Sequence, residues 1–138
     1  MTIEEKQQEI IDAFNVFDDW MEKYEYIIDL GKDLPLIKPE FKTEDRLIEG
    51  CQSRVWLQSE FKNNLMEYSA DSDAIITKGI IGILIQVMNK ETPETILKTD
   101  LHFIKEIGLQ EHLSPTRANG LVGMVKRMKT EAVKYINN

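Results

Sequence analysis

The stretch from Ala74 to Met88 constrains the fold more than any other part of the chain. Asp71-Ser72-Asp73 supplies helix-capping residues just before it, and the run is almost entirely apolar after Gly79. Apolar residues then lie nearly all around the predicted helix, so it has to be buried at the centre of the domain. We expect the other elements to surround it, and Gly79 and Gly82 to let another backbone come close.

The same run is too short to cross a membrane. Its charge-free part, Gly79 to Asn89, has 11 residues, whereas a spanning helix needs about 20. The first residues, Met1 to Lys6, lack the apolar core of a signal peptide and are too acidic for a transit peptide. One cysteine cannot form an internal disulfide, so nothing points to secretion. We therefore expect a cytoplasmic protein with no membrane partner.

Length and charge narrow the class of protein further. The 138 residues are the size of one ordinary domain, and we expect a single domain over residues 1–138. The net charge is −7, from 24 acidic and 17 basic residues. Because such a chain repels phosphate backbones, we expect no nucleic-acid partner.

Helical periodicity predicts two helices at the start of the chain. Apolar residues recur at helical spacing from Thr2 to about Leu30, with a break near Phe17-Asp18-Asp19. We expect Asp18 or Asp19 to cap a second helix that begins at Trp20, and Gly31 to end this helix as a C-terminal cap residue.

Strand-like residues occupy the middle of the chain. β-Branched and aromatic residues predict a strand over Arg54 to Ser59, and Asn63-Asn64 is turn chemistry before a return strand over Leu65 to Ala70. Arg46 to Ile48 is a further candidate strand. The sequence therefore predicts a small antiparallel sheet of about three strands.

The remainder of the chain is helical in pattern. Thr92-Pro93 and Ser114-Pro115 each place a capping residue before a proline, as at a helix start, and Gly108 closes a short helical piece over Leu101 to Ile107. We expect the last helix from Thr116 to about Ile136. Its expected apolar face comprises Leu121, Val122, Val125, Met128, Ala132 and Ile136. Helices, then a small sheet, then helices predict an α+β fold with the helices packed against one face of the sheet.

A resident metal or nucleotide has little support in these residues. Zinc takes three or four ligands, and the chain has one cysteine and two histidines, His102 and His112, without an HExxH motif. No glycine-rich phosphate loop occurs. We therefore expect neither a metal nor a nucleotide cofactor.

Cys51 raises the functional question. A lone cysteine is usually a small buried hydrophobe, but Cys51 lies in a loop, and Gly50 before it can take a positive φ that presents the sulfur at a sharp turn. The residues alone leave three hypotheses open. Cys51 is a reactive single thiol, it works with His102 or His112 in a thiol-dependent hydrolase or redox enzyme, or it is a structural residue of a binding module.

Arg117 is a second unusual residue. It falls in the first turn of the last predicted helix, where a cation faces the positive end of the helix dipole. Arg117 is therefore either exposed to solvent or paired with an anion, such as the Asp73 carboxylate or the Cys51 thiolate. Asp71 and Asp73 are also candidates for acid–base chemistry, although helix capping explains at least one of them.

Several of these residues lie in stretches that resemble a known family. EGCQSRVWL (Glu49–Leu57), DSDAIITKGI (Asp71–Ile80) and LSPTRANGL (Leu113–Leu121) together resemble SufE, the sulfur acceptor of the SUF iron–sulfur assembly system. YEYIIDLGKDLP (Tyr24–Pro35) resembles the family's segment of a helix followed by Leu-Pro. The four blocks occur in the family's order, and the resemblance runs from about Trp20 to Gly123.

The resemblance implies a fold and a function. The fold is the compact α+β fold shared with IscU-like iron–sulfur scaffold proteins. Cys51 would accept sulfur from the cysteine persulfide of a PLP-dependent cysteine desulfurase of the SufS or CsdA type, stimulate that enzyme, and pass the sulfur to a SufBCD-type scaffold. Gly50, Asp73 and Arg117 would support Cys51.

The resemblance also bears on cofactors and partners. PLP would belong to the desulfurase, so the chain itself would be an accessory protein without a cofactor. A cluster scaffold would need several ligands, whereas this chain has one cysteine. The matching blocks are shared by SufE and its relative CsdE, so they do not select between the two desulfurase partners.

Overall fold

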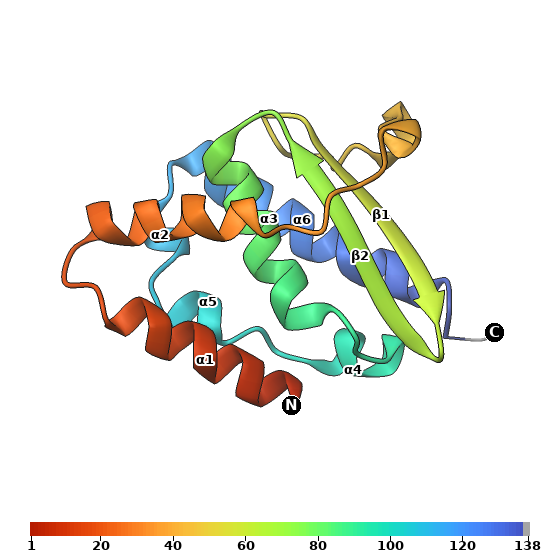
Figure 1. Cartoon of the computed structure of the whole chain (residues 1–138), viewed down its shortest axis with the longest axis horizontal. Helices are drawn as coiled ribbons and strands as arrows, with labels where there is room; N and C mark the ends of the chain where they lie inside the picture. The colour runs from red at the N-terminus through yellow and green to blue at the C-terminus, as the bar shows by residue number, and fades with distance from the viewer. Residues whose placement is uncertain (137–138) are drawn as a thin grey trace.

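Helix α3 (Ile75–Met88) runs through the middle of the molecule, with the other elements around it (Figure 1). The computed structural model describes residues 1–136. The other helices and strands of this part of the chain are α1 (Ile3–Asn15), α2 (Trp20–Lys32), β1 (Val55–Lys62), β2 (Leu65–Ser72), α4 (Pro93–Lys98), α5 (Phe103–Glu106) and α6 (Pro115–Val133). Short 3-10 turns occur at Pro39–Phe41, Glu44–Arg46 and Gln110–His112.

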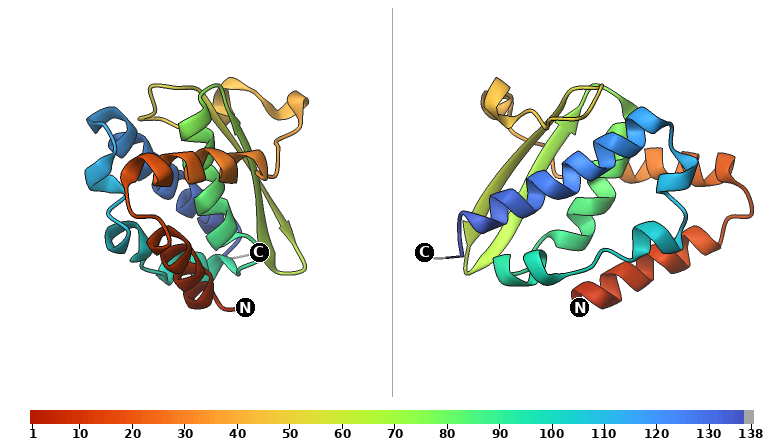
Figure 2. Two further views of the ribbon diagram at one scale, coloured as in Figure 1. Left: turned by 60° about the vertical axis from the view of Figure 1, so that its left-hand side comes forward. Right: turned by 180° about the vertical axis from the view of Figure 1, so that it is seen from behind.

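The predicted burial of α3 is confirmed. From Gly79 to Met88, every residue except Gln86 is buried. Helix α2 covers one side of α3, strand β2 packs on another, and α1 and α6 also contact it. Figure 2 shows α6 lying along the hairpin on the side that also carries α3. The fold is α+β, with a small antiparallel sheet packed against helices.

Helices α2 and α3 cross with their backbones in contact. A Cβ atom added to Gly79 would lie 2.1 Å from the carbonyl oxygen of Ile27, and one on Gly31 would lie 3.0 Å from the backbone nitrogen of Gly79. The prediction of close approach at Gly79 is confirmed. The prediction that Gly31 caps α2 is wrong, because Gly31 lies inside the helix, where it makes room for α3.

Strands β1 and β2 form the expected hairpin. They pair antiparallel from Val55 with Ser72 to Lys62 with Leu65. Asn63 and Asn64 connect them with φ values of 54° and 66°, the left-handed conformation that a two-residue hairpin turn of type I′ requires at both positions. The turn predicted at Asn63-Asn64 is confirmed.

The expectation of about three strands is wrong, since the described residues contain a two-stranded sheet. Glu44–Arg46 folds as a 3-10 turn, and Leu47 makes one isolated antiparallel bridge to Trp56. The chain then turns away at Gly50, whose φ is +90°. The candidate strand at Arg46 to Ile48 is therefore limited to a single pairing.

Most predicted helix starts are confirmed, and one is not. Asp19, Thr92 and Ser114 each accept a hydrogen bond from a backbone N–H in the first turn of their helices. The capping role expected within residues 71–73 is wrong. Ala74 is the N-cap of α3 and provides no side-chain cap, because β2 continues through Ser72.

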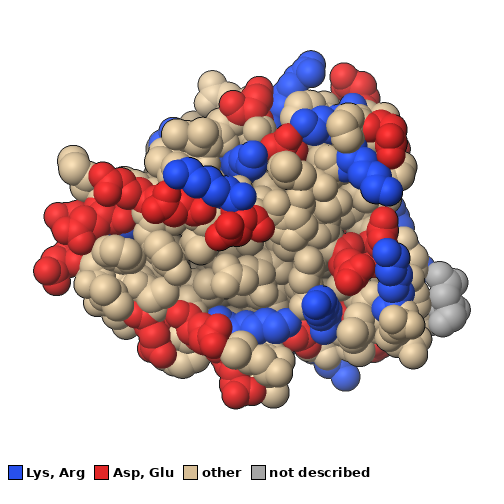
Figure 3. All heavy atoms as spheres, viewed as in Figure 1, with Lys and Arg blue, Asp and Glu red and all other residues tan. Residues whose placement is uncertain are grey.

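The surface charge is unevenly distributed. Figure 3 shows acidic side chains gathered at the end of the molecule formed by the α1–α2 connection and α2. The exposed acidic residues of this segment are Asp18, Asp19, Glu22, Glu25, Asp29 and Asp33. Among the described helices, none is both long enough and apolar enough to be a candidate for a membrane span.

The α2–α3 crossing yields a stability prediction. Gly79→Ala is expected to lower the free energy of unfolding by about 3 kcal/mol, because the new methyl group collides with the backbone of α2. The intrinsic helix preference of alanine recovers only about 1 kcal/mol of this loss. Urea denaturation followed by circular dichroism measures the change.

Gly82→Ala is the matched control for this measurement. Its Cβ would lie 3.5 Å from the nearest atom, the carbonyl oxygen of Leu30, which is an ordinary contact. We expect this variant to be as stable as the wild type or more stable. Equal effects of the two substitutions would contradict the proposed backbone contact.

Candidate functional site

Cys51 lies on the wall of a cavity between α3 and α6. The cavity has a volume of about 350 Å³. Three segments line it, namely the loop before β1, the first half of α3, and the start of α6 with its cap. The lining residues are Cys51, Gln52, Ser53, Thr77, Ile80, Ser114, Thr116, Arg117, Gly120 and Met124.

The Cys51 thiol packs against the backbone of α6. Its Sγ donates a hydrogen bond to the carbonyl oxygen of Gly120 over 3.7 Å, and the side chain is half-buried. A Cβ on Gly120 would lie 3.3 Å from Sγ. Burial raises the pKa of the Cys51 thiol above its ordinary value. Burial therefore favours the neutral thiol over the thiolate while the loop occupies this position.

The Cys51 loop (residues 49–53) approaches α6 through its own backbone. A Cβ on Gly123 would lie 2.5 Å from the carbonyl oxygen of Glu49, so the loop occupies the space that a side chain would fill. Gly50 takes a φ of +90°, in agreement with the expectation of a positive φ before Cys51. The turn at Gly50 and the space left by Gly123 thus allow the loop backbone to lie directly on α6, with the thiol at the cavity.

Asp73 lies at the end of the Cys51 loop and outside the cavity lining. Its Oδ1 accepts a hydrogen bond from the backbone N–H of Arg54 at 3.0 Å, and its own N–H donates to the Arg54 carbonyl oxygen at 3.2 Å. The Asp73 carboxylate therefore fastens the point where the chain leaves the loop and enters β1.

Asp71 has a separate structural role. It forms ion pairs with Lys42 at 2.6 Å and with Lys78 at 3.5 Å. Partial burial acts to raise the pKa of Asp71, but the hydrogen bonds from Lys42 and Ser72 and the two lysine charges lower it overall. A carboxylate held ionised in this way is suited to binding these lysines and is not poised to carry a proton.

Arg117 lines the same cavity as Cys51. It is the only charged side chain among the described residues of the lining, and it is exposed. No ion pair joins Arg117 to Asp73 within residues 1–136, whereas Arg117 and Cys51 line the same cavity. Arg117 and the N-terminus of α6 both favour a negative charge in the cavity.

The two histidines are engaged elsewhere. His102 lies between Glu4, at 2.8 Å, and Glu106, at 3.1 Å. His112 stacks on Trp20 with ring centroids 4.1 Å apart, and its Nδ1 contacts the Gly108 carbonyl oxygen at 2.8 Å. Neither histidine is among the residues that line the Cys51 cavity, so the structure does not assemble a Cys–His pair.

Metal ligands are likewise not gathered. Within the described part of the chain, no group of three or more His, Cys, Asp or Glu side chains lies in an arrangement able to hold a metal ion. The cavity at Cys51 brings together one thiol, one arginine and the N-terminus of α6.

Sequence reasoning missed Thr77, Gly120 and Gly123. Two glycines inside a predicted helix were the available signal, because an interior glycine costs a helix about 1 kcal/mol and often marks a close backbone contact. Val122, which was expected on the apolar face of α6, is 55% exposed. The inward positions there are Leu121 and Met124.

The buried position of Cys51 predicts a shifted pH profile. The rate of alkylation of Cys51 by iodoacetamide should rise with pH as the thiolate forms. In the native chain its midpoint should lie above that of the same chain unfolded in urea, because burial disfavours the thiolate. A native midpoint at or below the unfolded one would show instead that Arg117 and the α6 dipole dominate.

Comparison with known proteins places this site in a family. Residues 8–132 match the SufE family model, described as an Fe-S metabolism associated domain. An uncharacterised SufE-like protein of Rhizobium meliloti is 37% identical over 129 residues, covering 90% of this chain and 92% of that protein. SufE-like protein 1 of Arabidopsis thaliana, named as chloroplastic/mitochondrial, is 36% identical over 129 residues, covering 93% of this chain and 35% of that protein.

A solved structure agrees on the fold. The solution structure of a hypothetical protein from Thermus thermophilus superposes with a TM-score of 0.80 at 18% identity, covering 96% of this chain and 97% of that one. The family match extends over most of the chain, including all the residues that form the Cys51 cavity. The chain belongs to the SufE family, whose domain is associated with Fe-S metabolism.

Proposed function

We propose that this protein is a persulfide carrier that takes sulfur from a cysteine desulfurase on Cys51 and delivers it for iron–sulfur cluster assembly. The observation that carries the proposal is the placement of the chain's one thiol, on the Gly50 turn and against α6, at a cavity with room beside the sulfur. Membership of the SufE family supplies the metabolic context.

The transfer is a thiol–persulfide exchange. The Cys51 thiolate attacks the outer sulfur of the persulfide on the desulfurase cysteine. A new S–S bond forms at Cys51 while the old one breaks, and its electron pair leaves on the desulfurase sulfur as a thiolate. One sulfur atom moves in this step, and no external oxidant or reductant is consumed.

The resting position of the thiol is better suited to carrying a bound sulfur atom than to attacking the donor persulfide. A buried neutral thiol is a poor nucleophile, so the Cys51 loop has to leave α6 to meet the donor. Gly50 is the hinge we propose for this motion, since it tolerates large backbone changes. On return, the cavity would enclose the outer sulfur and protect it from small thiols.

Arg117 and Asp73 have different supporting roles in this proposal. Arg117 would face the persulfide from the cavity wall and favour its anionic form. Asp73 would keep the exit of the loop fixed to β1 while the thiol moves. Because both act on Cys51, replacing either is expected to slow sulfur transfer without removing the acceptor.

The identities of the sulfur donor and of the sulfur recipient are also proposals. We assign the donor as a PLP-dependent desulfurase of the SufS or CsdA type, stimulated by removal of its sulfur, and the recipient as a SufBCD-type scaffold. PLP would be bound by the desulfurase, and this chain would act as an accessory protein. The cytoplasmic location expected from the sequence stays a prediction.

The persulfide predicted on Cys51 is measurable by mass. After incubation with a SufS-type desulfurase and L-cysteine, the peptide that contains Cys51 should gain about 32 Da, one sulfur atom, by thiolate attack. The gain should disappear on treatment with dithiothreitol.

Cys51→Ser is the control for this experiment. It should acquire no sulfur and should fail to stimulate the desulfurase. If the wild type gains no mass, and Cys51→Ser stimulates the desulfurase as well as the wild type does, the proposed function is wrong.

A further inference from the structure

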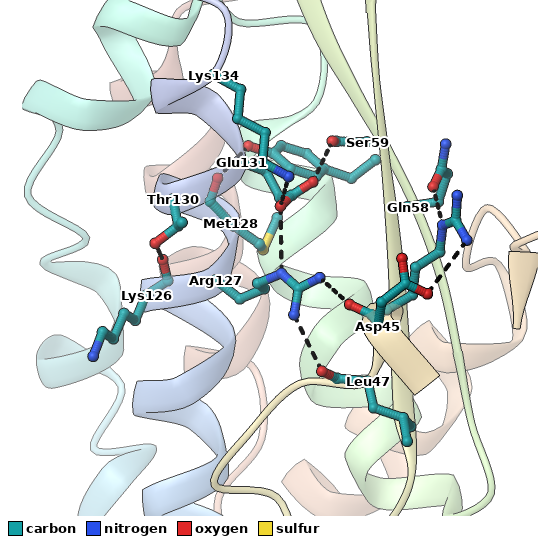
Figure 4. A network of polar contacts seen from close by, with 12 residues as sticks. Asp45, Leu47, Gln58, Ser59, Lys126, Arg127, Met128, Thr130, Glu131 and Lys134 are labelled. Carbon is teal, nitrogen blue, oxygen red and sulfur yellow. Dashed lines mark hydrogen bonds and ion pairs between the residues drawn. The ribbon is translucent and has the colours of Figure 1, made fainter. Parts of the chain in front are cut away.

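A polar network on α6 lies beside the chain segment that leads into the Cys51 loop (Figure 4). At its centre is Glu131, which is only 8% exposed. One carboxylate oxygen accepts a hydrogen bond from Ser59 of β1 at 2.8 Å, and the other contacts Lys134 at 2.7 Å and the Nε of Arg127 at 3.4 Å. Glu131 thereby orients the guanidinium group of Arg127.

The two terminal nitrogens of this guanidinium group bind backbone carbonyl groups. Nη1 of Arg127 donates to the carbonyl oxygen of Leu47 at 3.1 Å, and Nη2 donates to that of Asp45 at 2.8 Å. Leu47 is also the residue that bridges to Trp56. The rigid fork of an arginine suits two carbonyl groups held in fixed positions. Arg127 therefore ties the segment before the Cys51 loop to α6.

The spacing along α6 connects this tie to the thiol. Arg127 follows Gly123 by four residues and Gly120 by seven, so the three positions lie on one side of the helix, about one and two turns apart. In the same order, they meet Leu47, Glu49 and Cys51. The loop thus runs antiparallel to α6 and touches it at successive turns.

We propose that Arg127 is a positioning residue for Cys51, which holds the entry of the Cys51 loop on α6 and thereby keeps the thiol at its cavity. This inference deepens the proposed function, on which its biological meaning rests. The contacts of Gly120 and Gly123 with the loop include no charged hydrogen bond. Among the described contacts between α6 and this segment, the charged hydrogen bonds are those that Arg127 donates.

Alkylation of Cys51 in the isolated protein tests the proposal. In Arg127→Gln, the rate with iodoacetamide near neutral pH should rise about tenfold, the effect of losing roughly one charge-assisted hydrogen bond from the docked loop. The midpoint of the rate against pH should also move down, toward that of the urea-unfolded chain. A residue that merely stabilised the fold would leave this midpoint unchanged in the folded protein.

Lys126→Gln is the matched control. It removes the same charge from the neighbouring position, and the Lys126 side chain points away from the network (Figure 4). This variant should react as the wild type does. Arg127→Lys keeps the charge beside Glu131 but cannot hold both carbonyl groups, so it should react faster than the wild type as well.

The outcomes separate this proposal from the proposed function. An unchanged rate and midpoint in folded Arg127→Gln would overturn the positioning role, and if that variant does not fold, the same result in Arg127→Lys would overturn it. An equal acceleration in Lys126→Gln would overturn it too, because charge alone would then explain the effect. No desulfurase is used here, so failure to load sulfur on the wild type would instead count against the carrier function.

Discussion

Burial of α3 on every side is the constraint on which the rest of the structure depends. An apolar helix of this kind has to be enclosed, and here α2 encloses it through direct backbone contact at Gly79 while β2 and α6 cover other sides. The first turns of α3 and α6 then converge, and the Cys51 cavity lies between them. The position of the site follows from the way in which the central helix is covered.

The thiol is held in this cavity mainly by backbone contacts. Glycines at positions 120 and 123 give α6 a surface on which the Cys51 loop can lie, while Arg127 and Asp73 fasten the two ends of that loop. An arrangement with fixed ends and a weakly held middle is suited to a group that alternates between a sheltered and an exposed position. The same burial that shelters the sulfur raises the pKa of the thiol.

Local patterns in the sequence predicted most of the elements. The hairpin turn at Asn63-Asn64 and the helix starts marked by proline depend on neighbouring residues, so they could be predicted from the sequence alone. Gly31 and Asp73 could not, because their roles depend on contacts with Gly79 and with Arg54, which are distant in sequence. A glycine near a helix end and an aspartate before a helix each fit a local rule that tertiary contacts overrode.

The candidate site was predictable only in part for the same reason. Cys51 and Gly50 were identified from their own chemistry and Arg117 from its place in the first turn of a predicted helix, and the family resemblance then gave all three a common role. Thr77 and Gly120 could not be predicted as walls of the cavity, because they line it only once α3 and α6 are packed together. The Arg127 network required knowledge of which loop lies on α6, which no residue spacing indicates.

The central claim is that Cys51 carries sulfur and that the cavity shelters it. The most direct measurement loads the chain with sulfur from a desulfurase and L-cysteine, removes the desulfurase, and follows sulfide release by dithiothreitol from the native and from the urea-unfolded chain. The account predicts that the native chain releases sulfide much more slowly. Equal rates of release, or a chain that carries no sulfur after loading, would contradict it.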